Sequence, residues 1–294
     1  MTSTRDQVDG GFTPPSPEDI GINYDQLIDL HALIASDISL HIGMWTKPGE
    51  REPASTLPEL SNRAQVAQTD YHLEALGLKA NEHLLDIGCG AGSPAIRIAQ
   101  QSGGRVTGIN VSQGQLAKAT ERAQAANISD RVSFQYGDAM ALDFADESFD
   151  AAMSIEVFPH LSDRQQGFTE AARVLRPGGH FLVSDFTLRG APSEDLLAAY
   201  QHTWDATCPI TPAKMMELAA AAGFELVKAE SMTQNTIFSG EVMGLLYADR
   251  HDEIIDRYGA DVVAEFDQVM PMVRTFFRDH LASYLFLLRK PLKV

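Results

Sequence analysis

Three glycines alternate with other residues in the segment from Leu84 to Gly92, directly after a short apolar run. Such a run predicts a strand, and Ser93 and Pro94 are typical of the N-cap and the first residue of a helix. Glycines let a ligand approach the backbone, and the free N–H groups of a helix start attract anionic groups. The segment therefore predicts a site for a nucleotide-like ligand, with a merely tight structural turn as the alternative.

The elements that would position this turn alternate along the middle of the chain. Helical segments separate apolar runs that predict five strands, at residues 84–87, 105–109, 132–136, 149–155 and 180–186. This alternation is typical of a doubly wound parallel sheet in an α/β protein. Two further strands are expected at residues 224–232 and 283–289. The helical signals between them predict a cap, with a kink or a break at Pro271.

The ends of the chain differ in pattern from this middle part. We expect residues 1–20, rich in Pro, Gly, Ser and Thr, to form a flexible arm, and residues 21–80 to form an N-terminal helical lid. The ligand-binding core should then cover residues 81–236. A helical cap at 237–280 and the last strand and tail at 281–294 complete the expected organisation.

The charge balance excludes some function classes. The chain has 23 basic and 40 acidic residues and a formal net charge of −17, which argues against a general nucleic-acid binder. No apolar run approaches the roughly 20 residues that span a bilayer, and residues 1–20 lack the pattern of a signal peptide. We therefore expect a cytoplasmic protein without a membrane partner.

Four ordered segments carry a resemblance to a known family. They are residues 84–94, the run from Gly137 to Met140, the pair Phe149-Asp150 and the run from Arg173 to Gly179. In this order they resemble the motifs of the class I S-adenosylmethionine-dependent methyltransferases. The segments 41–45, 93–97 and 106–112 look most like the bacterial natural-product tailoring subgroup, such as the enzymes of the rebeccamycin and rifamycin pathways.

The resemblance implies a fold and a cofactor. The fold is a Rossmann-like doubly wound sheet of seven strands, mostly parallel with the last strand antiparallel, and the cofactor is S-adenosylmethionine, with S-adenosylhomocysteine as product. By position, the backbone at Gly88 and Gly90 approaches the methionine part of the cofactor, and Asp86 helps to hold its ammonium group. Asp138 accepts a hydrogen bond from the adenine amino group, and the N–H of Ala139 donates to the ring.

One position departs from the common family pattern. The residue that ends the second strand is usually an acid that accepts hydrogen bonds from both ribose hydroxyls, but here it is Asn110. An amide can accept from one hydroxyl, and Gln115 can share the task. The departure also disfavours NAD, which relies on that acid. Trp45 could cover the cofactor, because an aromatic face suits a sulfonium cation, or it could simply pack.

Methyl transfer mainly requires that the acceptor be held in line with the methyl group, and a base helps when the acceptor is a hydroxyl. His160 is the leading base because it follows the fourth strand at the carboxyl edge of the sheet; a capping role is the alternative. In the sugar O-methyltransferase that the chain resembles, this segment carries a His pair, whose first member is replaced here by Pro159. Asp185 could orient or share the base, and Glu156 is a third catalytic candidate.

The acceptor itself is not named by any motif. We expect O-methylation of a small natural product. The alternative reaction is C-methylation of a prenyl or terpenoid alkene through a carbocation. A hypothesis from another class is a protein that binds S-adenosylmethionine without catalysis. Aromatic residues could line the acceptor site: Tyr24, Phe158, Phe186, Tyr200 and Trp204. We expect no metal site, and a homo-oligomer formed through the N-terminal helices is a hypothesis.

Overall fold

The computed structural model describes residues 12–26, 28–34, 39–45 and 53–293. Within these residues a sheet of seven strands has the order β3-β2-β1-β4-β5-β7-β6. The strands are β1 (His83–Ile87), β2 (Arg105–Asn110), β3 (Val132–Tyr136), β4 (Phe149–Ile155), β5 (Leu175–Leu188), β6 (Glu225–Ser231) and β7 (Leu281–Arg289). The last strand, β7, runs antiparallel to both β5 and β6, and the other pairings are parallel. The predicted fold class is therefore confirmed.

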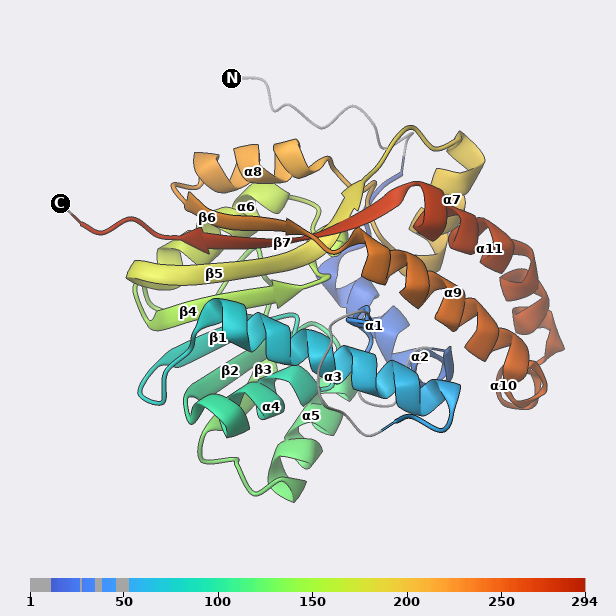
Figure 1. Ribbon diagram of the computed structural model, residues 1–294, viewed down its shortest axis with the longest axis horizontal. Coiled ribbons are helices and arrows are strands. Elements are labelled where there is room, and N and C mark those ends of the chain that lie inside the picture. Colours follow the sequence, from blue (N-terminus) through green and yellow to red (C-terminus); the bar gives the residue numbers. More distant parts are fainter. Residues whose placement is uncertain (1–11, 27, 35–38, 46–52, 294) are drawn as a thin grey trace.

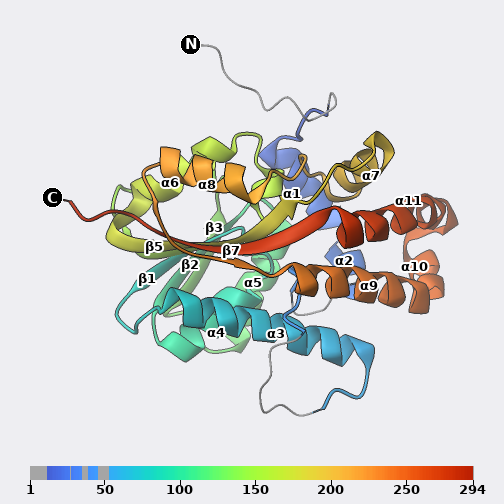
Figure 2. The same ribbon diagram turned by 45° about the horizontal axis from the view of Figure 1, so that its top comes forward.

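Helices cover both faces of the sheet. Figures 1 and 2 show α3 (Leu57–Leu76), α4 (Ser93–Ser102) and α5 (Gln113–Ala125) on one face, and α6 (Arg164–Val174) and α8 (Pro212–Ala221) on the other. The short helix η1 (Phe158–His160) follows β4. Leu84, Val106 and Met153 face the first group of helices, whereas Leu85, Phe149 and Phe181 face the second. Burial of these apolar side chains fixes the sheet between its two helical layers.

A third apolar cluster holds a helical cap together at one end of the sheet. It joins α2 (Ile28–Ile34) and α7 (Glu194–Trp204) to the three helices between β6 and β7, which are α9 (Thr233–Asp249), α10 (His251–Tyr258) and α11 (Ala260–Asp279). In Figure 1 these helices lie together beyond the ends of the strands. The cap therefore begins four residues earlier than predicted, and it also includes α7, which we expected in the core.

The predicted arm is shorter than expected, because α1 (Pro17–Gln26) already includes residues 17–20. Ser16 Oγ accepts a hydrogen bond from the Asp19 N–H at 3.1 Å, and Asp19 Oδ2 accepts from the Ser16 N–H at 3.3 Å. This reciprocal capping, with Pro17 in the first turn, starts the helix inside a Pro-rich segment. Residues 1–11 of the predicted arm lie outside the described residues.

Two local predictions need correction. The N-cap of α4 is Gly92, with φ = 82°, so Ser93 is the first helical residue and Pro94 the second. The break predicted as one possibility at Pro271 is absent, because the helix α11 is continuous through this residue. Its buried residues on both sides of the proline, among them Val263 and Val273, anchor it in the cap cluster, and this packing outweighs the lost backbone hydrogen bond.

Candidate active site

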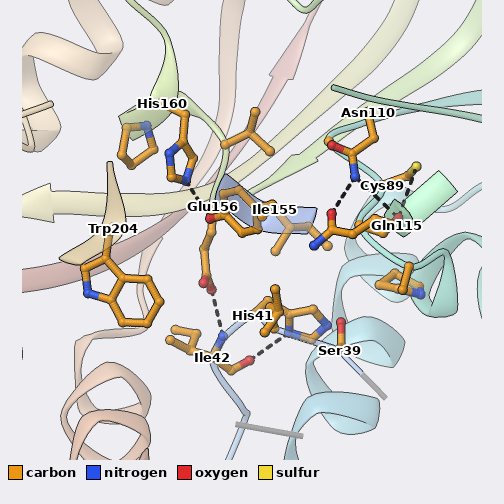
Figure 3. A pocket seen from close by; sticks show the side chains of 18 of the residues that line it. Ser39, His41, Ile42, Cys89, Asn110, Gln115, Ile155, Glu156, His160 and Trp204 are labelled. Carbon is orange, nitrogen blue, oxygen red and sulfur yellow. Dashed lines mark hydrogen bonds between the residues drawn. The ribbon is translucent and has the colours of Figure 1, made fainter. Parts of the chain in front are cut away.

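A pocket lies where β1, β2, β4 and β5 end, and residues of α1, α3 and the cap also line it. Ligands of open α/β sheets bind at this edge. The pocket is lined by most of the predicted site residues, which are Tyr24, Trp45, Asp86, Gly88, Gly90, Asn110, Gln115, Asp138, Ala139, Glu156, His160, Phe186, Tyr200 and Trp204. The structure therefore brings together residues that lie up to 180 positions apart in the chain, and several of them are seen in Figure 3.

The glycine-rich turn forms one wall of this pocket. Gly88 and Gly90 have φ values of 73° and 53°, in the left-handed region that favours glycine. A Cβ at Gly88 would lie 2.3 Å from Val157 Cγ2, whereas a Cβ at Gly90 would meet nothing within 4 Å. The turn at Gly90 thus leaves open space beside the backbone, which a ligand can fill.

Asp86 provides a buried acid at this turn. Asp86 is 2% exposed, and its Oδ2 has no hydrogen-bond partner among the residues that the structure describes. Burial raises the pKa of Asp86 to about 7. A carboxylate in this position is stabilised by a cation that enters the pocket, so the site fits the ammonium group of an amino-acid ligand.

Asn110 and Gln115 lie side by side at the end of β2 and the start of α5. Asn110 Nδ2 donates to Gln115 Oε1 at 2.6 Å, as Figure 3 shows, and Asn110 Oδ1 accepts from the Val111 N–H at 2.8 Å. Both side chains are buried and line the pocket. Their amides form one hydrogen-bonded unit, which is consistent with the expected sharing of ribose contacts between the two residues.

Asp138 and Ala139 follow β3 at the far end of this wall. Asp138 Oδ1 accepts a hydrogen bond from the Met140 N–H at 2.8 Å, which fixes the carboxylate beside the pocket. Its second oxygen can accept a hydrogen bond from a ligand amino group.

The side chain and the backbone of Trp45 are both held by α9. Trp45 Nε1 donates to Ser239 Oγ at 2.8 Å, and the Trp45 N–H donates to Asn235 Oδ1 at 2.9 Å.

His160 and Tyr24 meet at the other end of the pocket. His160 Nδ1 lies 3.3 Å from the Asp205 carbonyl oxygen, and Nε2 lies 3.1 Å from the Tyr24 hydroxyl. A carbonyl can only accept, so Nδ1 carries the proton, Nε2 is the acceptor, and the Tyr24 O–H donates to it. Burial lowers the pKa of His160, which keeps the ring neutral at neutral pH and leaves the lone pair of Nε2 free to accept a hydrogen bond.

Glu156 lies between the two ends of the pocket. Its backbone has φ = 57°, and its Oε1 accepts a hydrogen bond from the Ile42 N–H at 2.9 Å, as seen in Figure 3. Burial, together with the nearby Asp185 carboxylate, raises the pKa of Glu156 well above its usual range. The carboxyl group connects the end of β4 to the segment that carries Trp45.

Two predicted site residues do not line the pocket. Phe158 is buried in the core, where its ring packs on Phe168 and Phe181. Asp185 is fully buried: Oδ2 accepts from the Phe158 N–H at 2.9 Å and Oδ1 accepts from the Phe186 N–H at 2.7 Å. Asp185 therefore positions the segment that carries His160 by binding its backbone, and it does not line the pocket.

Sequence reasoning missed pocket residues in three segments. His41, Ile42 and Gln65 line the pocket, as does Ser239 of α9. The signal on α3 was a polar stripe at helical spacing, which is usually a solvent-exposed face. Here the polar stripe is buried against the sheet.

Among the described residues, no three His, Cys, Asp or Glu side chains gather as the ligands of a metal ion would. None of the helices in the described part of the chain has the length and apolar character needed to cross a bilayer.

The fold and the pocket define an α/β protein that binds a nucleotide-like ligand with an amino-acid part. The profile of a family described as "Methyltransferase domain" matches residues 85–183. The 27-O-demethylrifamycin SV methyltransferase of Amycolatopsis mediterranei is 34% identical over 285 residues, which cover 95% of this chain and 100% of the relative. The chain therefore belongs to the S-adenosylmethionine-dependent methyltransferases.

Another relative and a solved structure also match nearly the whole chain. The (+)-O-methylkolavelool synthase of Herpetosiphon aurantiacus is 30% identical over 276 residues, 94% of this chain and 95% of the relative. The crystal structure of the [4+2]-cyclase SpnF superimposes with a TM-score of 0.81 at 28% identity and covers 96% of this chain and 98% of its own. The cofactor of the family is S-adenosylmethionine, and the buried, unpartnered Asp86 and the open space at Gly90 fit its methionine part.

Proposed function

We propose that the protein methylates a hydroxyl group of an apolar small molecule, with His160 as the base. The observation that carries this proposal is the hydrogen bond from the Tyr24 hydroxyl to His160 Nε2 inside the pocket. It supports a neutral imidazole whose lone pair accepts a proton from a hydroxyl group. An acceptor hydroxyl that replaces the Tyr24 hydroxyl on Nε2 would form the same bond.

The chain's own groups would then assist the transfer as follows. Bound S-adenosylmethionine supplies an electrophilic methyl group. As the acceptor oxygen bonds to the methyl carbon and the carbon–sulfur bond breaks, the acceptor proton passes to His160 Nε2. The Asp205 carbonyl, which accepts from Nδ1–H, stabilises the imidazolium ring that forms. The two products are the methyl ether and S-adenosylhomocysteine.

The walls beside His160 support an apolar acceptor. Phe186, Tyr200 and Trp204 line this part of the pocket, together with Met243 and Phe277 of the cap. The lysine and arginine that line the pocket both lie on α5, the helix that carries Gln115, and not on the cap. A phosphorylated acceptor would need a cationic clamp beside the aromatic wall. The names of two relatives also specify O-methylation.

C-methylation of an alkene is the second candidate. It would produce a carbocation, which aromatic faces stabilise, and Tyr200 and Trp204 offer such faces in the pocket. The two candidates differ in the product. A methyl ether and an alkene-derived C-methyl group have distinct proton and carbon NMR shifts, and only the ether requires a hydroxyl on the acceptor.

The test is a screen of apolar acceptors with and without a free hydroxyl, using S-adenosylmethionine labelled in its methyl group. We expect label in an O-methyl product, and turnover that EDTA does not reduce because we propose transfer without a metal ion. Label in a C-methyl product would favour the second candidate. Cofactor binding without any transfer would favour a non-catalytic protein.

We also propose a cytoplasmic location and a homo-oligomer formed through the N-terminal helices. Ile22 on α1 is exposed, which supports an apolar contact there. The net charge of −17 supports the proposal that nucleic acid is not a partner. Light scattering at several protein concentrations tests the oligomer, and a monomer at every concentration would contradict it.

A further inference from the structure

The short helix η1, which ends at His160, is held through the main chain of its first residue. Asp185 Oδ2 accepts a hydrogen bond from the Phe158 N–H at 2.9 Å, and Arg164 Nε donates to the Phe158 carbonyl at 3.1 Å. A buried acid and a guanidinium thus bind the two polar groups of one peptide residue. Arg164, the first residue of α6, therefore fixes the segment that carries His160 together with Asp185.

The same guanidinium also holds the loop that follows α7. Arg164 Nη2 donates to the Thr207 hydroxyl and, at 2.9 Å, to the Cys208 carbonyl. Thr207 in turn donates to the Pro159 carbonyl, from its N–H at 2.7 Å and from its hydroxyl at 2.8 Å. Arg164 and Thr207 therefore join residues 205–208 to η1 as one hydrogen-bonded unit.

The conformation of this loop decides which nitrogen of His160 carries the proton. Asp205 caps the end of α7 with φ = 47°, a left-handed conformation that is unfavourable for a residue other than glycine. Its carbonyl oxygen lies 3.3 Å from His160 Nδ1, so the proton is on Nδ1 and Nε2 is the acceptor. Such a conformation persists only where the surrounding structure holds it, and Arg164 and Thr207 provide contacts directly after Asp205.

We propose that Arg164, assisted by Thr207, is a positioning residue for His160, because it holds the Asp205 carbonyl on Nδ1 and thereby keeps Nε2 unprotonated in the pocket. Neither Arg164 nor Thr207 lines the pocket, so both act through His160 and not on a ligand. Their importance for methyl transfer rests on the proposed function, in which Nε2 takes the acceptor proton. Their control of the tautomer does not depend on it.

The experiment is nitrogen-15 NMR of the histidine side chains, because the shifts of the two ring nitrogens report which of them carries the proton. His160→Asn identifies the signals of His160, and we expect the Nδ1–H form in the wild type. Arg164→Lys keeps the positive charge, but an ammonium group does not reproduce the fork with which a guanidinium binds several acceptors. In this variant the Nε2–H form should appear, and kcat should fall on the order of tenfold with little change in the KM of S-adenosylmethionine.

Three further variants complete the experiment. Thr207→Val removes the hydroxyl without a change of charge and should have the same effect, whereas Thr207→Ser keeps the hydroxyl and should behave like the wild type. Arg173→Lys is the matched control, because Arg173 lies at the other end of α6 and likewise donates to backbone carbonyls, those of Leu142 and Phe144. It should leave His160 in the Nδ1–H form.

A pure Nδ1–H form in both Arg164→Lys and Thr207→Val, or an Nε2–H form in the wild type, would overturn the proposal. An equal share of the Nε2–H form in Arg173→Lys would also overturn it, because the effect would then be a general loosening of α6. The NMR measurement needs no turnover. The proposed function is tested separately, since an unchanged kcat in His160→Asn would contradict that function and leave the result on the tautomer intact.

Discussion

The ring of His160 lies between a carbonyl oxygen and a phenol, and this arrangement sets its proton chemistry. We expect His160→Asn to lower kcat by roughly 10²- to 10⁴-fold, which is the usual contribution of a general base. Tyr24→Phe removes only the hydroxyl that occupies Nε2, so its kcat should change far less. Steady-state kinetics with a hydroxyl acceptor would measure both. Equal losses in the two variants would mean that Tyr24 takes part in the proton transfer itself.

The buried acid at the glycine turn predicts a pH dependence of cofactor binding. Burial raises the pKa of Asp86 to about 7, so the carboxylate that attracts the ammonium group is lost as the pH falls below 7. The affinity for S-adenosylhomocysteine should therefore fall by roughly tenfold between pH 8 and pH 6. Calorimetry at both values measures this change. In Asp86→Asn the affinity should be lower at pH 8 and nearly independent of pH, and a persistent tenfold change there would refute the assignment.

At the scale of elements, α1 is held on both sides of the pocket. Asp25 Oδ1 accepts hydrogen bonds from Ser112 Oγ and from the Gly114 N–H, and Asn23 Nδ2 donates to Asp205 Oδ2 at 2.7 Å. Asp25→Ala should detach α1 from Ser112 and Gly114, so we expect the dissociation rate of the cofactor to rise by roughly tenfold. Stopped-flow displacement measures this rate. Asp25→Asn keeps the accepting oxygen and should change it much less; identical rates in all three proteins would exclude α1 as a cover.

The buried polar face of α3 predicts an acid sensitivity of the fold. His72 is buried, and within the described part of the chain neither of its ring nitrogens has a hydrogen-bond partner. Burial, and to a smaller extent the nearby His41, lowers its pKa to about 3. The unfolded chain therefore binds an extra proton below pH 6.5, and stability that is present above 6.5 is lost as the pH falls toward 3. Urea unfolding at pH 7.5 and 5.5 should show that His72→Leu loses about 1.4 kcal/mol less than the wild type between these values. The buried acids are present in both proteins, so their opposite dependence cancels in this comparison.

The elements differ in how well the sequence predicts them. The strands of the core were predictable because apolar runs and glycine turns alternate there, and each signal is local. The association of α7 with the cap was not predictable, because it depends on the stacking of Tyr200 on Phe276, and these residues are far apart in the chain. For the same reason Phe158 and Phe186, which look alike in sequence, lie in the core and in the pocket respectively. Burial of the polar stripe on α3 also depends on tertiary packing alone.

For the whole molecule, the pocket joins the core to the cap, so a bound cofactor should stabilise both together. S-Adenosylhomocysteine at 100 times its Kd adds about 2.7 kcal/mol to the stability of the folded state, which corresponds to a rise in Tm of roughly 5 °C. Differential scanning fluorimetry measures this shift. NAD at the same concentration should leave Tm unchanged, because Asn110 replaces the acid that its ribose normally requires. A rise in Tm with NAD but not with S-adenosylhomocysteine would contradict the assignment of S-adenosylmethionine as the cofactor.

The position of β7 has a consequence for biosynthesis. This strand lies between β5 and β6, and within the described residues β6 pairs with no other strand. On the ribosome, β6 and the cap helices therefore emerge before the strand that joins them to the sheet. We expect nascent chains that stop before residue 281 to expose an unpaired strand edge and to depend on chaperones. The cap is thus joined to the sheet only after β7 has been synthesised.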